Sequence, residues 1–163
     1  MILIVKNKLM SVGGSSSVTD ENGNRAYNVK GKAFSITKKK YVKDLNGKTL
    51  FKVRNKFWKF FVHKALIYDG DGTQVAKVIR KFSLKANFIV EGTEKPLRVD
   101  GNFIGLDLDI ILGEEKIGHI RRKFVALTDE FHVDVYNDED APFLVALVIA
   151  IDNIYDRANK NRN

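Results

Sequence analysis

An unbroken apolar run lies near the end of the sequence, where residues 141–151 (APFLVALVIAI) contain no charged or polar side chain. Three acidic residues, 138–140, come directly before it, and Pro142 falls in what would be the first helical turn. Acidic side chains and an early proline both favour the start of an α-helix. The pattern predicts a helix over about residues 141–155, although its β-branched residues would also suit a strand.

This apolar run is too short to cross a membrane as a helix. Eleven helical residues rise only about 16 Å, whereas the hydrocarbon layer of a bilayer is about 30 Å thick. A helix that is apolar on every side has to be surrounded by other elements. We therefore expect the rest of the chain to enclose it.

The preceding residues show the pattern of antiparallel strands. Asn22-Gly23, Asn46-Gly47, Asp71-Gly72 and Asp100-Gly101 are typical of tight turns. Runs between these pairs, such as FVHKALIY and FHVDVY, are rich in β-branched and aromatic residues and alternate in polarity. Ten to twelve strands of this kind tend to close into a barrel, and the apolar helix would fill its interior.

A repeated motif indicates which side chains face inward. It occurs as NGKTLFKVRNKF (46–57), DGTQVAKVIRKF (71–82) and GEEKIGHIRRKF (113–124), with a weaker copy at 22–34. Because successive strand residues point to opposite faces, the alignment on the final phenylalanines, Phe57, Phe82 and Phe124, places Val53, Val78 and Ile120 on the same inner face. The opposite face then carries Lys52, Lys56, Lys77, Lys81, His119 and Lys123.

Length and composition fit one cytosolic domain. We expect residues 1–156 to form a single domain and the basic residues 157–163 to form a frayed tail. Cysteine is absent, which removes disulfides and thiolate chemistry and favours a reducing compartment. The start of the chain, MILIVKNKLM, has too short an apolar stretch for a signal peptide, so we interpret it as the first strand.

The net charge of +8 predicts an anionic partner such as acidic lipid, nucleic acid or acidic protein, unless the charge serves only solubility. Basic residues cluster in TKKKY (37–41), RNKFWKFF (54–61) and IRRK (120–123), where solvated strand ends are the plain alternative. If the strand ends converge at one rim, their charges add. The candidate anion-binding residues are Lys38, Lys39, Lys40, Arg54, Lys56, Lys81, Arg121 and Lys123.

Other chemistry has little support in the sequence. DGDGT (69–73) resembles a calcium loop, but Arg80 stands where the bidentate glutamate is needed, so a hairpin turn is favoured. His63, His119 and His132 lack the spacing of metal ligands, and no activated serine motif is present. Asp152 should lie at the barrel mouth and accept hydrogen bonds, with a general base as the alternative. We assign no catalytic, cofactor-binding or metal-binding residue and expect no cofactor.

These stretches together resemble the LURP-one-related family over nearly the whole chain, notably in VTDENGNRAYNVKGKAFS, YDGDGTQVAKVIRKF, GNFIGLDLDIILGEEKIGHIRRKF and LVALVIAIDN. That family is similar to tubby C-terminal domains and phospholipid scramblases. The resemblance implies a mainly β fold, a closed antiparallel barrel of about twelve strands around one buried hydrophobic C-terminal helix. Residues 150–152 match a family feature that we interpret as structural.

The resemblance implies less about activity. Many members of the family have no known function, whereas tubby domains bind phosphoinositide headgroups and scramblases respond to calcium. No ligand motif of either relative can be matched position by position. We expect a non-enzymatic cytoplasmic module that binds anionic phospholipid headgroups at the membrane surface. The alternatives are a protein-interaction or structural module with incidental charge, then nucleic-acid binding, and last an unrecognised enzyme.

Overall fold

A computed structural model of the chain describes residues 1–6, 15–31, 37–56, 64–81, 86–102, 105–125 and 128–160. It contains twelve strands followed by a 3-10 turn (Asp138–Asp140) and one helix, α1 (Ala141–Lys160). The strands are β1 (Ile2–Lys6), β2 (Ser15–Asp20), β3 (Arg25–Gly31), β4 (Lys40–Lys43), β5 (Thr49–Asn55), β6 (Lys64–Asp69), β7 (Gln74–Lys81), β8 (Ala86–Glu91), β9 (Leu97–Asn102), β10 (Asp107–Leu112), β11 (Glu115–Val125) and β12 (Thr128–Val135).

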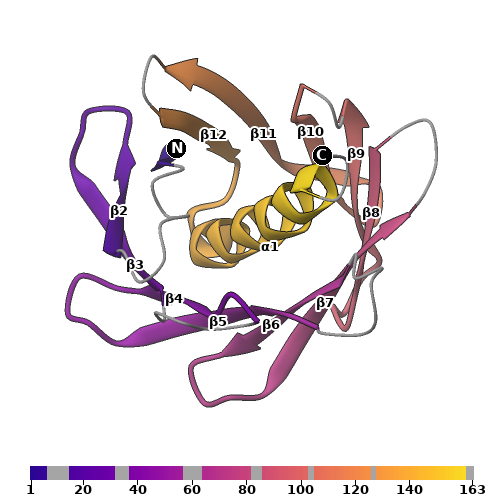
Figure 1. The fold of residues 1–163 in the computed structure, drawn as a ribbon, viewed down its shortest axis with the longest axis horizontal. Helices are drawn as coiled ribbons and strands as arrows, with labels where there is room; N and C mark the ends of the chain where they lie inside the picture. The colour runs from indigo at the N-terminus through magenta and orange to yellow at the C-terminus, as the bar shows by residue number, and fades with distance from the viewer. Residues whose placement is uncertain are drawn as a thin grey trace.

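The twelve strands form one closed antiparallel barrel, as the alternation and the resemblance predict. Each strand pairs with the strands before and after it in the chain, and β1 closes the ring by pairing with both β2 and β12. Figure 1 looks along the barrel and shows α1 running through its interior. A barrel of this size needs such a filling because its own side chains do not reach across the lumen.

The two ends of the barrel differ. At one end, called the turn end, short connections follow β2, β4, β6, β8 and β10, and α1 begins there. Three of these turns share one design, in which Asp20, Asp44 or Asp69 accepts a backbone N–H of its own turn and Gly23, Gly47 or Gly72 adopts a positive φ. The opposite, loop end contains the remaining connections, most of whose residues lie outside the described ranges.

One predicted turn is wrong. Asp100-Gly101 lies inside β9 rather than between two strands, with Gly101 opposite Leu108 of β10. The glycine allows the backbones of β9 and β10 to approach closely, because a Cβ at this position would collide with the carbonyl oxygen of Asp107. An Asp-Gly pair therefore has two physical uses, and the sequence pattern does not distinguish them.

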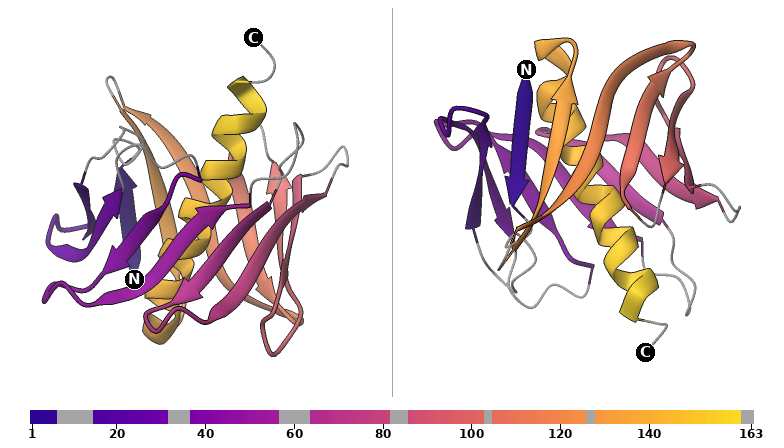
Figure 2. Two further views of the ribbon diagram at one scale, coloured as in Figure 1. Left: turned by 60° about the horizontal axis from the view of Figure 1, so that its bottom comes forward. Right: turned by 90° about the horizontal axis from the view of Figure 1, so that it is seen from above.

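The helix is buried along the part that the apolar run encodes. Ala141, Ile154 and every residue from Leu144 to Ile151 are almost fully shielded from solvent. The helix packs mainly against β5 and β6, where the rings of Phe51 and Phe143 meet edge to face with centroids 5.8 Å apart. The predicted buried helix is confirmed, and its terminal turns extend beyond the strands at the loop end (Figure 2).

The helix is longer than predicted. It continues to Lys160, so residues 157–160 of the expected frayed tail are helical, while 161–163 lie outside the described residues. The apolar pattern stops near Tyr155, the last helix residue of the predicted span, which is itself half-buried. Backbone hydrogen bonding continues through residues such as Arg157 and Ala158, whose types favour helix.

The inner face of the barrel follows the repeated motif. Val53, Val78 and Ile120 are buried in the core, as the alignment predicts. Lys56, Lys81 and Lys123 are exposed. Phe57 and Phe82 lie outside the described residues, and so does the side chain of Phe124.

Candidate anion-binding surface

Basic side chains gather on the outer wall formed by β3 to β7. Alternation turns Lys30, Lys43, Lys52, Arg54, Lys64, Lys77 and Lys81 outward on these five consecutive strands, and Lys56 follows the end of β5. We call this set of eight residues the basic arc. It covers one side of the barrel because consecutive strands are neighbours in the ring.

Strand register brings three lysines of the basic arc together at the loop end. The backbone N–H of Lys56 donates to the carbonyl oxygen of Lys64 at 3.1 Å, so these residues face each other across β5 and β6. Lys64 is opposite Ile79 of β7, two residues before Lys81. Within the described parts of the chain, these three lysines take part in no ion pair.

Tyr68 organises the centre of the arc. Arg54 donates from Nε and Nη2 to the Tyr68 hydroxyl oxygen, at 3.0 and 2.6 Å. The ammonium group of Lys52 lies 4.4 Å from the centre of the same ring. The electron-rich ring face attracts both cations and offsets the repulsion between them. Two positive charges are thus held side by side on the outer wall.

Glu91 marks the border of the arc on β8. Lys77 donates to its carboxylate at 2.6 Å, and this hydrogen bond is the main reason that the pKa of Glu91 is below its usual value. The charges of Lys77, Lys64 and Lys81 lower the pKa further. Three lysines of the basic arc therefore act together on the pKa of Glu91, at the edge of the arc.

The opposite side of the barrel carries the opposite balance of charge. Residues 25–81 contain 16 Lys and Arg against 3 Asp and Glu, a net charge of +13, whereas residues 82–163 contain 10 against 15, a net charge of −5. Around β10 and β11 the cations are paired with acids. Lys116 contacts Asp109 at 2.7 Å, and this hydrogen bond is the main reason that the pKa of Asp109 is low. Positive charge therefore predominates in the segment that forms β3 to β7, and negative charge in the segment that follows it.

Comparison with known proteins shows the family to which the chain belongs. The profile of LURP-one-related proteins matches residues 1–152. The chain belongs to the LURP-one-related family. An X-ray structure of a protein from Arabidopsis thaliana is similar to it, with a TM-score of 0.65 and 22% sequence identity over 97% of this chain and 91% of that chain. At this identity the likeness shows a shared fold. Functionally curated proteins give no significant match.

The LURP-one-related barrel divides the eight predicted anion-binding residues among three places. Lys38 and Lys39 precede β4 at the loop end, where Thr37 accepts the backbone N–H of Asn55 on β5, the strand of Arg54, while Lys56 and Lys81 follow or end β5 and β7 at the same end. Lys40 is only 5% exposed and occupies an inward position opposite Val53. Arg121 and Lys123 lie on β11, six strands from β5 in the ring, and Arg121 binds Asp134 at 2.8 Å. The eight candidate residues therefore do not form one patch.

Sequence reasoning missed five of the eight residues of the basic arc. Lys30, Lys43, Lys52, Lys64 and Lys77 were not among the candidate residues, because each stands alone in the sequence rather than in a run of cations. Two signals could have found them: the charge balance counted by segment, and the strand alternation that turns them all outward.

The remaining candidate sites have different outcomes. DGDGT forms the β6–β7 hairpin turn, in which Asp69 Oδ1 accepts the backbone N–H groups of Asp71 and Thr73, so the predicted turn is confirmed. His63 lies outside the described residues. His119 contacts Asp107 and Asp109, and His132 contacts Glu130. Within the described ranges, no three His, Cys, Asp or Glu side chains are arranged to hold a metal ion.

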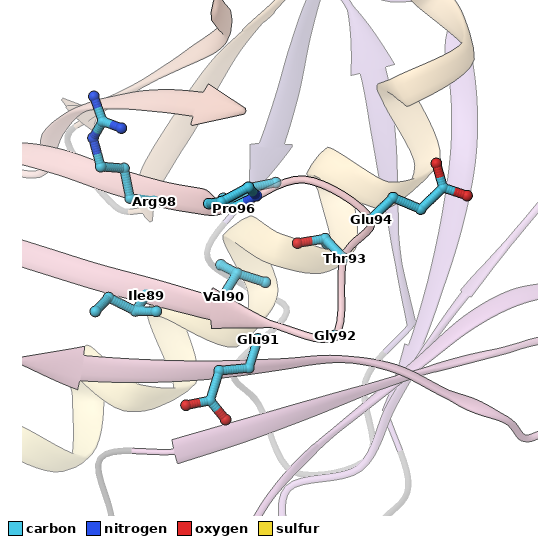
Figure 3. Close-up of a pocket in the computed structure, with 9 residues that line it drawn as sticks. Ile89, Val90, Glu91, Gly92, Thr93, Glu94, Pro96 and Arg98 are labelled. Carbon is cyan, nitrogen blue, oxygen red and sulfur yellow. The ribbon is translucent and has the colours of Figure 1, made fainter. Parts of the chain in front are cut away.

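A groove of about 520 Å³ follows the β8–β9 hairpin near the turn end (Figure 3). Its lining is largely apolar and includes the exposed side chain of Ile89, which lies opposite Arg98 on β9. The one cation in the lining, Arg98, already binds Asp100 Oδ2 at 2.9 Å and the Gly113 carbonyl oxygen at 3.0 Å. The groove therefore does not extend the anion-binding surface.

In the described part of the LURP-one-related chain, no helix combines the length and the apolar character needed to cross a bilayer.

Proposed function

We propose that this protein is a non-enzymatic binding module that attaches to anionic membrane surfaces through the basic arc. The supporting observation is the basic arc on one wall of the barrel, which belongs to a segment, residues 25–81, with a net charge of +13. Near an anionic membrane each lysine or arginine contributes about 1 kcal/mol. Several lysines on adjacent strands would therefore suffice for reversible attachment from the cytoplasm.

The shape of the basic arc favours a broad partner over a small substrate. The arc spreads over the convex outside of five strands, where many charges can meet a surface at once. Catalysis would instead require a concave site with convergent polar groups of perturbed pKa. We therefore favour phospholipid headgroups as the partner, ahead of an acidic protein, and nucleic acid is the third candidate.

Vesicle sedimentation tests the proposal. The test variant replaces Lys56, Lys64 and Lys81 with Gln, and the matched control replaces Lys6, Lys95 and Lys123, which lie on other strands and turns. Each triple variant has a net charge of +5 instead of +8. We expect the test variant to lose roughly a hundredfold in partition onto phosphatidylserine vesicles at low salt, from about 1 kcal/mol per lysine. The control should lose much less.

The single tryptophan provides a second measurement. Trp58 lies in the sequence between Lys56 and Lys64. Its fluorescence should shift to shorter wavelength with phosphatidylserine vesicles but not with phosphatidylcholine vesicles, and added salt should reverse the shift.

Equal loss in both triple variants would reduce the effect to net charge, and no preference for acidic vesicles at low salt would exclude the membrane. Steeply salt-dependent binding to single- or double-stranded nucleic acid, with no vesicle binding, would favour the third candidate instead.

A further inference from the structure

The buried polar side chains of the described residues all lie at the loop end of the barrel. Elsewhere the described interior is apolar, but Lys40, Asn55, Asp152 and Asn153 are each 5% exposed or less. Asn55 ends β5, Lys40 begins β4 opposite Val53, and the other two lie in the later turns of α1. These residues surround the inner mouth of the barrel and are separate from the outward-facing basic arc.

The face of α1 that carries Asn153 is turned toward β5. Leu144 meets β11 at Gly118, and the ring of Tyr155 lies 5.2 Å from the guanidinium carbon of Arg122, also on β11. Asn153 is nine residues after Leu144, about two and a half helical turns, so it points to the opposite side. The strand opposite β11 in the ring is β5, where Asn55 faces inward at the same end.

Among the residues that the structure describes, two asparagines in this mouth have amide atoms without a hydrogen-bond partner. Asn153 is 0% exposed and neither its Oδ1 nor its Nδ2 is bonded. Asn55 is 3% exposed, and its Oδ1 is also unbonded. An unsatisfied buried polar group is expensive, and nearly all such groups in native proteins have a partner. A polar ligand bound in the mouth would supply the missing hydrogen-bond partners.

The charge around these amides is positive. Arg80 and Arg122 occupy inward positions at the ends of β7 and β11, opposite Phe88 and Phe131. With Lys40 they bring three cations to the mouth, against the one buried carboxylate of Asp152. Both arginines are half-buried, so solvent reaches the mouth as far as their side chains.

We propose that the loop-end mouth is a second site, which binds a phosphate monoester or free phosphate. The unbonded amide atoms are two acceptors, the Oδ1 atoms of Asn55 and Asn153, and one donor, the Nδ2 of Asn153. An ionised carboxylate only accepts hydrogen bonds, whereas a phosphate monoanion has a P–OH that donates and further oxygens that accept. The P–OH donates to the Oδ1 of Asn55 or Asn153, the Nδ2 of Asn153 donates to a phosphate oxygen, and the cations balance the charge.

Phosphorus NMR of inorganic phosphate with the full chain at pH 6 tests the site. The wild type should broaden the phosphate resonance, and sulfate of equal ionic strength, which has no OH to donate, should compete poorly. Asn153→Leu should raise the apparent Kd for phosphate at least tenfold. It should also raise the Tm without ligand, because an unbonded buried amide is replaced by an apolar group of similar size. Asn55→Leu provides an independent second variant with the same expected loss.

Asn28→Leu is the matched control. Asn28 lies on the outside of β3, where its Nδ2 donates to the Asp44 carbonyl oxygen at 3.3 Å. This variant should bind phosphate like the wild type. Equal phosphate binding by Asn153→Leu and the wild type would overturn the proposal, as would equal competition by sulfate.

Vesicles distinguish the source of the phosphate. Phosphatidic acid carries a monoester, whereas phosphatidylserine carries a diester without the titratable P–OH. If the ligand is a headgroup, the wild type should prefer phosphatidic acid at equal surface charge, and Asn153→Leu should lose this preference. If it is a free phosphate compound, glycerol phosphate should bind and neither lipid should be preferred. The triple Gln variant of the basic arc keeps the mouth intact, so failure of the membrane proposal leaves phosphate broadening unchanged.

Discussion

Gly118 and Leu144 meet where the central helix touches the wall of the barrel: a Cβ placed on Gly118 would lie 3.0 Å from Leu144 Cδ1. The same Cβ would lie 2.8 Å from the backbone carbonyl oxygen of Asp134. The helix and two strands thus share a space that fits only a residue without a side chain.

Gly118→Ala is expected to destabilise the fold by about 1–3 kcal/mol, the usual cost of overpacking. Urea unfolding measures the change. Adding Leu144→Ala should recover only part of the loss, because the contact with the Asp134 carbonyl oxygen remains. Gly105→Ala is the control, since its nearest neighbour is the end of the Asn102 side chain at 3.3 Å. Equal stability of Gly118→Ala and the wild type would contradict this packing.

A chain that ends at Asn137 should be insoluble or unfolded. It keeps all twelve strands but lacks α1, so the inward-facing residues of the barrel lose the surface they bury. Each large apolar side chain of the helix contributes about 1.5–3 kcal/mol when buried. A chain that ends at Lys160 should instead be soluble and unfold cooperatively. Sedimentation and thermal melts compare the two, and a soluble, cooperatively melting short chain would refute the central role of the helix.

His132 should make stability depend on pH. Burial is the main reason that its pKa is lowered in the folded protein, with the charge of Lys123 next. As pH falls below about 6.5, the usual pKa of histidine, the unfolded chain takes up a proton that the folded protein resists. The stabilising difference is therefore complete above pH 6.5 and is lost as the pH falls through the folded-state pKa.

The comparison is between the wild type and His132→Gln, which cannot titrate. From pH 7.5 to 5.5, the free energy of unfolding from urea melts should decrease more in the wild type than in the variant. Parallel curves would mean that His132 titrates alike in both states.

The sequence predicted the fold well because its strongest patterns report on burial. The unbroken apolar run from Ala141 to Ile151 has no other use in a chain that is 29% charged, and the alternation around Val53, Val78 and Ile120 follows from facing a core. The prediction of a turn at Asp100-Gly101 was wrong because a glycine can also be required where two backbones approach closely. The end of the helix was predicted too early because its last residues, up to Lys160, are helical without being part of the apolar pattern.

The candidate surface was only partly predictable. A repeated motif shows which face of a strand a lysine takes, but not which side of the barrel that strand occupies, and Lys123 is therefore far from Lys56 and Lys81. Lys40 stands in a basic run, yet the register with Val53 turns it inward. The unbonded amides of Asn55 and Asn153 have no sequence signal, because an isolated asparagine is typical of any surface.

The position of α1 after all twelve strands affects how the protein can be made. During synthesis the wall leaves the ribosome before the element that it encloses. Closing the ring joins Val5 to Phe131, segments separated by most of the chain, and such distant pairing is slow. Until then the nascent strands expose valines and leucines with nothing to cover them. Folding should therefore be largely post-translational, and chaperone demand should be greatest just before release.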